Sequence, residues 1–115
     1  MSPRTEVCFL VDADGSVLWS DRSGSPSRLP DSRPRWEAIW AHRDELAVIA
    51  HSHPEGPLAF SAEDVSTMAA IDAALGRALR YAVVAPDGIT YRGPGPEVAQ
   101  EPSWAARMRD ESGME

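Results

Sequence analysis

The chain has little from which to build a disulfide framework, a membrane span or a nucleic-acid-binding face. Its 115 residues include one cysteine, Cys8, which excludes an internal disulfide and a cysteine-rich zinc module. No stretch approaches the eighteen or more apolar residues of a membrane span, and the N-terminus does not resemble a signal peptide. Acidic residues outnumber basic ones by 18 to 11, and this balance argues against nucleic acid as a partner because phosphate binding needs a basic face. We therefore expect a cytoplasmic protein that binds neither membranes nor nucleic acid.

What remains is the composition of an ordinary globular domain, with 43% hydrophobic and 25% charged residues. At this length a single hydrophobic core must serve the whole chain. Apolar periodicity and turn residues predict strands at 6–11, 16–20, 46–50, 79–85 and 89–92, and helices from about 34 to 43 and from 62 to 75. The predicted order is strand, strand, helix, strand, helix, strand, strand, which is typical of an α/β domain.

Two segments have the composition of connections. Residues 21–34 (DRSGSPSRLPDSRP) predict a long loop, at the end of which Ser32 can cap the next helix. Residues 93–115 begin with a linker-like stretch, and 103–110 (SWAARMRD) either form a short amphipathic helix or fray, fraying being the preferred interpretation. We therefore assign 1–92 to the domain and 93–115 to a linker and C-terminal tail.

Two of the three histidines stand together at the end of an apolar run, in the sequence LAVIAHSHP. On a strand, alternate side chains share a face, so His51 and His53 point the same way. Their Cβ atoms are then about 6 to 7 Å apart, which suits two imidazoles that chelate one divalent metal ion. The pattern predicts a metal site at the end of a buried strand.

A second group of polar residues opens the following helix. Ser61 is a candidate N-cap, and Asp64 lies in the first helical turn, where the preceding loop can fold it back over the strand end as a third ligand. Three protein ligands leave a fourth position for water, as in catalytic zinc sites. The alternative interpretation is that Ser61 and Asp64 serve helix-start chemistry alone, since Ser-x-x-Asp is nearly a capping box.

These residues resemble the motif of the JAMM/MPN metalloproteases, Glu…His-x-His-x7-Ser-x-x-Asp, and match its second half at each defined position. The proline after His53 and the Gly56-Pro57 pair are similar to the prokaryotic members. The resemblance implies an α/β fold of the JAMM/MPN, cytidine-deaminase-like architecture, with a mixed, mainly antiparallel sheet flanked by helices. Members usually have a strand and a helix before the motif glutamate, so we expect a minimal version that lacks them, with a sheet edge open to a partner or a second copy.

The resemblance also implies the glutamate. Glu6, at the head of EVCFLV, holds the place of the residue that opens a strand beside the histidine strand. Glu45 shares strand parity with His51 but lies about 20 Å away along the strand. The other candidates fall in a helix, in a loop, and beside Asp64 at an offset of about 100° around the helix: Glu37, Glu55 and Glu63. For Glu6 itself, the alternative is a solvated carboxylate at a strand edge.

The implied activity is zinc-dependent hydrolysis of a peptide or isopeptide bond, after the C-terminal glycine of a ubiquitin-like or sulfur-carrier protein. His51, His53 and Asp64 would hold Zn²⁺, Glu6 would act as the general base and Ser61 would hydrogen-bond the developing oxyanion. An extended substrate would add to a sheet edge. Two other functions remain open: a scaffold of the MPN type that catalyses nothing, and a protein of the RadC type associated with DNA repair.

Overall fold

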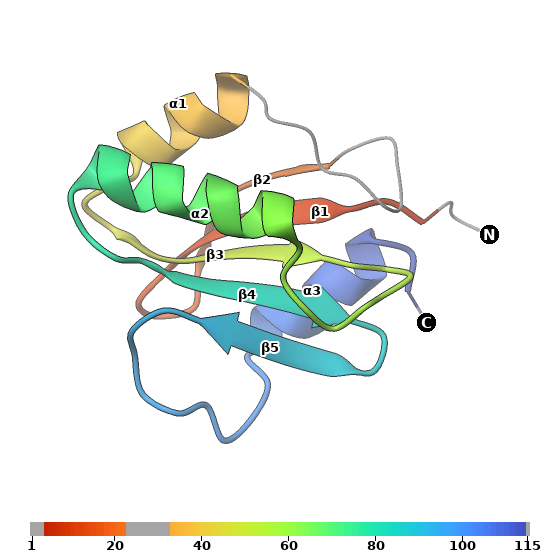
Figure 1. The fold of residues 1–115 in the computed structure, drawn as a ribbon. Coiled ribbons are helices and arrows are strands. Elements are labelled where there is room, and N and C mark those ends of the chain that lie inside the picture. The colour runs from red at the N-terminus through yellow and green to blue at the C-terminus, as the bar shows by residue number, and fades with distance from the viewer. Residues whose placement is uncertain (1–3, 23–32, 115) are drawn as a thin grey trace.

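The structure is a computed structural model that describes residues 4–22 and 33–114. Five strands and three helices follow one another along these residues (Figure 1): β1 (Val7–Asp12), β2 (Val17–Arg22), α1 (Arg33–Ala41), β3 (Leu46–Ser52), α2 (Ala62–Leu75), β4 (Arg80–Ala85), β5 (Gly88–Arg92) and α3 (Ser103–Glu111). The first seven follow the order that the sequence predicts, and α3 is added after them.

The strands form one sheet in the order β2-β1-β3-β4-β5. Three of its four pairings are antiparallel, and β3 pairs with β4 in parallel because the chain crosses over through α2 between them. The predicted mixed, mainly antiparallel sheet is therefore confirmed. Within the described residues, β2 and β5 are the two edge strands.

The helices lie on both faces of this sheet (Figure 1): α1 and α2 on one, α3 on the other. The alternation of side chains along β3 shows how the faces differ. Ile49 belongs to the cluster of buried residues under α1 and α2, whereas Ala50 belongs to the cluster under α3. His51 follows on the face of Ile49 and Ser52 on the face of Ala50, so the metal-binding candidates lie on the side of α1 and α2.

Helix α2 has the boundaries expected from its capping residues. Ser61 is its N-cap, and its side chain accepts a hydrogen bond from the backbone N–H of Asp64. Gly76 ends the helix in the left-handed conformation, with φ of 70°, which a residue with a Cβ adopts only at a cost. The start of α2, and with it Asp64, is therefore fixed relative to the end of β3.

The structure shortens the predicted loop 21–34 at both ends. Asp21 and Arg22 belong to β2, because they pair with Cys8 and Val7 of β1. Arg33 and Pro34 already belong to α1. Residues 23–32, including the predicted cap Ser32, lie outside the described residues.

The structure also differs from the interpretation of the C-terminal tail as a frayed terminus. Residues 103–111 form α3, and three of its side chains are buried in the cluster that covers the second face of the sheet: Trp104, Ala105 and Met108. The burial of these side chains stabilises the helix, because an isolated helix of this length is marginal in water. The short amphipathic helix, the other interpretation of this segment, is the one that the structure contains.

None of the described helices combines the length and the apolar character needed to cross a membrane.

Candidate metal centre

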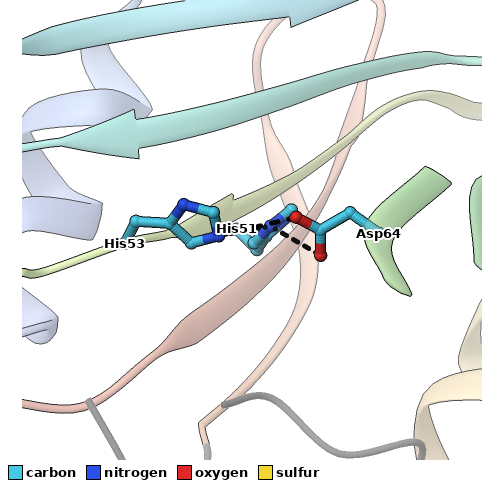
Figure 2. Close-up of side chains that lie close together, drawn as sticks. All are labelled: His51, His53 and Asp64. Atoms are coloured by element: carbon cyan, nitrogen blue, oxygen red, sulfur yellow. Dashed lines mark hydrogen bonds and ion pairs between the residues drawn. The ribbon is translucent and has the colours of Figure 1, made fainter. Parts of the chain in front are cut away.

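The three predicted ligands come from two elements that the crossover brings together. His51 is the next-to-last residue of β3, and His53 directly follows the strand. Asp64 is in the first turn of α2. Figure 2 shows the carboxylate of Asp64 directed from the helix toward the ring nitrogens of the histidines. The parity of β3 and the capping of α2 thus aim all three side chains at one point.

The distances between the ligand atoms suit a single metal ion. The two Nε2 atoms are 3.1 Å apart, Nε2 of His51 is 3.3 Å from Oδ1 of Asp64, and Nε2 of His53 is 3.6 Å from Oδ2. Ligands at about 2.0 to 2.1 Å from a tetrahedral ion are separated from one another by about 3.3 Å. The three residues are therefore a group that could hold a metal ion.

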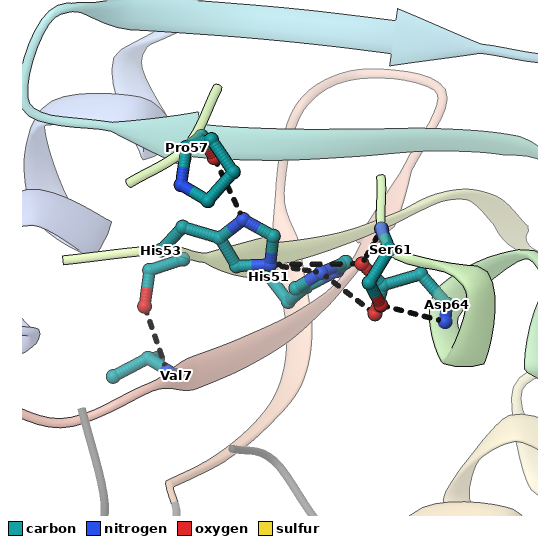
Figure 3. A network of polar contacts seen from close by, with 7 residues as sticks. Val7, His51, His53, Pro57, Ser61 and Asp64 are labelled. Atoms are coloured by element: carbon teal, nitrogen blue, oxygen red, sulfur yellow. Dashed lines mark hydrogen bonds and ion pairs between the residues drawn. The ribbon is translucent and has the colours of Figure 1, made fainter. Parts of the chain in front are cut away.

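The ring of His53 is held in the orientation that a ligand needs. Its Nδ1 lies 2.9 Å from the carbonyl oxygen of Pro57, as Figure 3 shows. A carbonyl oxygen accepts only, so Nδ1 carries the proton and, in the neutral ring, Nε2 presents its lone pair toward His51 and Asp64. The backbone N–H of His53 donates to Val84 of β4 at 2.8 Å, which anchors the residue to the sheet.

Asp64 serves the helix start and the candidate metal centre at once, so the two interpretations of the Ser-x-x-Asp pattern do not exclude each other. Its Oδ2 accepts from the backbone N–H of Ser61 at 2.8 Å, which completes a capping box, while Oδ1 faces His51. Burial alone would raise the pKa of the Asp64 carboxyl. Hydrogen bonds from His51, His53 and Ser61 outweigh it and hold that pKa well below its usual range. Asp64 is thus anionic, as a carboxylate ligand of a metal ion would have to be.

Glu6 lies on the same face as the histidines. Cys8 of β1 pairs with His51, so Glu6, two residues before Cys8, falls opposite His53 when the register is extended. It is 4% exposed, which excludes the interpretation as a solvated carboxylate. Burial raises the pKa of Glu6 to about 7, against the nearby charges of His53 and Arg35, which lower it. A carboxylate with a pKa near neutrality is well suited to exchange a proton.

These groups line one cleft of about 660 Å³ between α2 and the sheet. Apolar residues form its floor, among them Ile49 and Ile71. Arg35 of α1 also faces it and lies 3.2 Å from Asp21 of β2, as a largely buried ion pair. Cys8 lies in the cleft as well, and burial raises the pKa of its thiol to about 12, so it is a neutral core residue at ordinary pH. The cleft therefore joins a polar end, which holds the candidate metal centre, to an apolar floor.

The sequence did not reveal every residue that shapes the site. The carbonyl of Pro57, which orients His53, belongs to a loop whose path no motif defines. Arg35 comes from the first predicted helix, to which the sequence assigned no part in the site. Of the rival glutamates, Glu63 also lines the cleft, but it is exposed. Glu45 lines a separate hollow beside Arg43 and Arg77.

The comparisons with known proteins agree with the geometry. A family model described as prokaryotic homologs of the JAB domain matches residues 6–92. The match begins at Glu6, contains all of the candidate site residues and ends before α3. No curated protein is similar enough in sequence to count as a relative.

Proposed function

Because the chain belongs to the family of prokaryotic JAB domain homologs, we propose that it is a zinc-dependent peptidase that cleaves a peptide or isopeptide bond. Its substrate would be a protein that ends in glycine, of the ubiquitin-like or sulfur-carrier kind. The observation that carries this proposal is the convergence of His51, His53 and Asp64 in a cleft that also contains the buried Glu6.

The donor set suits zinc. Two imidazoles and one carboxylate form the three-ligand set of catalytic zinc sites, in which the fourth position remains available. A divalent metal ion bound here would supply a Lewis acid that polarises the scissile carbonyl and acidifies a water molecule. Asp64 is in the anionic state that such an ion requires. Burial would lower the pKa of His53, but its contacts with Asp64, Pro57 and Glu6 raise it, so an ion at Nε2 would compete with a proton there.

Glu6 is the proton carrier in this proposal. Its carboxylate accepts a proton from the attacking water, whose oxygen forms the new bond to the scissile carbonyl carbon. When the bond between carbon and nitrogen breaks, the same carboxyl passes the proton to the leaving amine. The raised pKa of Glu6 supports both steps, although a divalent cation nearby would lower that pKa by favouring the charged form.

Ser61 can assist as a hydrogen-bond donor. Its oxygen accepts from the N–H of Asp64 at 3.0 Å, which leaves the hydroxyl proton available to a second partner. The residue is exposed beside the cleft, where an oxyanion formed on the substrate would accept that proton. An extended substrate would reach this position by pairing with an edge of the sheet, and β2 is the edge beside β1.

The test uses a linear fusion of a ubiquitin-like protein, joined through its terminal Gly-Gly to a reporter. We expect Glu6→Gln to keep its zinc and to lower turnover by roughly a hundred-fold or more, because an amide cannot accept the proton of water. Asp64→Asn should weaken zinc binding and turnover together. Glu63→Gln, an exposed neighbour in the same cleft, is the matched control and should change neither.

Three results would count against the proposal. A parent protein that binds zinc but cleaves no such fusion would favour a scaffold. Full activity in Glu6→Gln would transfer the base to another carboxylate, and loss of zinc from Glu6→Gln would make Glu6 a ligand.

A further inference from the structure

β2 pairs with Val7, the neighbour of Glu6, but on the side of the histidine strand the sheet does not hold Glu6. Pairing between β1 and β3 ends at Cys8 and His51, so Glu6 lies two residues beyond the last pair. His53, by contrast, is anchored to β4 through its own N–H and to the following loop through its ring. Something other than the β1–β3 ladder must therefore hold Glu6 beside the histidines.

Side chains and one carbonyl take the place of the missing pairing. The N–H of Val7, directly after Glu6, donates to Oγ of Ser52 at 2.8 Å. The N–H of Thr5, directly before Glu6, donates to the carbonyl oxygen of Ser112 at 3.1 Å. The hydroxyl of Ser112 in turn donates to Oγ of Ser52. The backbone on both sides of Glu6 is thus bound to one pair of serines.

This serine pair lies behind the site. Figure 3 shows Val7 on β1 beside the strand that carries the histidines. Ser52 stands between His51 and His53 in sequence and faces away from them, toward α3, by the alternation of the strand. Both serines are 0% exposed, so their hydrogen bonds do not compete with water.

Ser112 is held firmly enough to act as an anchor. It is the C-cap of α3, and its N–H donates to the carbonyl of Met108 at 2.9 Å. Arg109 ties the same helix to the turn between β4 and β5, through the carbonyls of Ala85 and Gly88 at 3.1 Å each. The helix also buries Trp104 against the sheet. These contacts hold α3, and with it Ser112, in a fixed position on the sheet.

We propose that Ser112 is a positioning residue for Glu6, acting through Ser52, so that α3 belongs to the working part of this chain although the family match ends before it. The inference rests on the proposed function, because it assigns Glu6 its catalytic role. Its physical content is that the two buried hydroxyls fix the backbone from which the Glu6 carboxylate reaches the site.

The expected effects follow from which hydrogen bonds each substitution removes. Ser112→Ala removes the hydroxyl that fixes Ser52 but keeps the Ser112 carbonyl, which still accepts from Thr5. Glu6 should therefore lose only part of its positioning. A misplacement of about 1 Å at a reacting group costs as much as a hundred-fold in rate, so we expect kcat to fall roughly ten-fold. Ser52→Ala removes the acceptor of Val7 itself, and its kcat should fall further.

The experiment measures kcat, KM, zinc content and the amide exchange of Val7 in the full chain. For Ser112→Ala we expect a lower kcat, an unchanged KM, one zinc per chain and a roughly ten-fold faster exchange of the Val7 N–H. The double variant Ser52→Ala/Ser112→Ala should be no worse than Ser52→Ala alone, because the two hydroxyls act as one unit.

The control is Ala105→Gly, which weakens α3 through its buried face without touching either serine. It should lower the stability of the fold and leave kcat unchanged below its melting temperature. If Ala105→Gly lowers kcat as much as Ser112→Ala does, the effect is general loosening and the proposal is wrong. It is also wrong if Ser112→Ala leaves either kcat or the Val7 exchange at the parent value.

Failure of the proposed function gives a different pattern. A parent with no peptidase activity would refute the function, whereas the Val7 exchange decides the anchoring independently. Faster exchange in Ser112→Ala but not in Ala105→Gly supports the anchor, and equal exchange in all three proteins overturns it.

Discussion

The two faces of the sheet are built from alternate residues of the same strands and yet have opposite characters. The face under α3 is closed: its cluster is apolar and largely buried, and Trp104, Ala105 and Met108 are 5% exposed or less. The face under α1 and α2 opens into a cleft in which half-buried histidines and a carboxylate stand above an apolar floor. Both faces contain a buried apolar cluster, but only the face under α1 and α2 also opens a cleft lined by polar groups.

The polar groups of the open face affect the stability of the fold. Burial and the like charge of Asp64 raise the pKa of Glu6, so in the absence of a cation the ionised form of Glu6 weakens the fold. The buried clusters on both faces of the sheet supply the stability against which this arrangement can persist. Substitutions on the two faces should therefore have different consequences.

The largest effect is expected on the sealed face. Trp104→Ala removes a side chain that is 5% exposed, and we expect the free energy of unfolding to fall by about 3 to 5 kcal/mol. The exposed tryptophan of α1 is the matched control: Trp40 is 54% exposed, and Trp40→Ala should cost less than about 1 kcal/mol, most of it the contact with Arg43. Urea unfolding measures both. Equal losses would mean that α3 does not seal this face.

The contribution of α3 shows where prediction from the sequence ends. The pattern SWAARMRD allows a short helix, but fraying was the preferred interpretation, and nothing in the pattern states which surface such a helix covers. The hydroxyl of Ser112 meets Ser52 across 60 residues of chain, and no local pattern predicts that contact. By contrast, His51, His53 and Asp64 were predictable because strand parity and helix capping are local rules with fixed geometry. Glu6 was found through a family resemblance, and its burial could not be derived from its own neighbours in sequence.

An intermediate effect is expected on the open face, and it depends on pH. Burial raises the pKa of Glu6 from 4.5 to about 7, so the folded state binds this proton more tightly than the unfolded chain does. The stability associated with protonated Glu6 is complete below pH 4.5 and is lost as the pH rises through 7. In metal-free protein, Glu6→Gln should therefore be more stable than the parent near pH 8, by up to about 3 kcal/mol, and similar to it near pH 4.

Unfolding free energies of the two proteins at several pH values, in the presence of a chelator, measure this difference. A difference that does not change with pH would show that Glu6 titrates normally, and hence that its environment is not the buried one described above. With zinc bound the difference should shrink, because the cation favours the carboxylate.

The smallest effect is expected at Ser61, and it separates the role of this residue as the N-cap of α2 from its proposed role in catalysis. Ser61→Ala removes the N-cap and should cost about 1 kcal/mol, whereas Ser61→Asn keeps a capping acceptor and should cost only a few tenths. If the Ser61 hydroxyl also stabilises the oxyanion, both variants should lose turnover alike. Turnover that follows stability across the two variants would reduce Ser61 to a helix cap.

The central claim is that the open face holds one zinc ion through His51, His53 and Asp64. X-ray absorption at the zinc edge of protein loaded with zinc tests it directly. We expect one zinc per chain in a shell of two nitrogen ligands and otherwise oxygen, at about 2.0 to 2.2 Å. A sulfur ligand at about 2.3 Å would place Cys8 in the shell instead, and protein that retains no zinc would contradict the account.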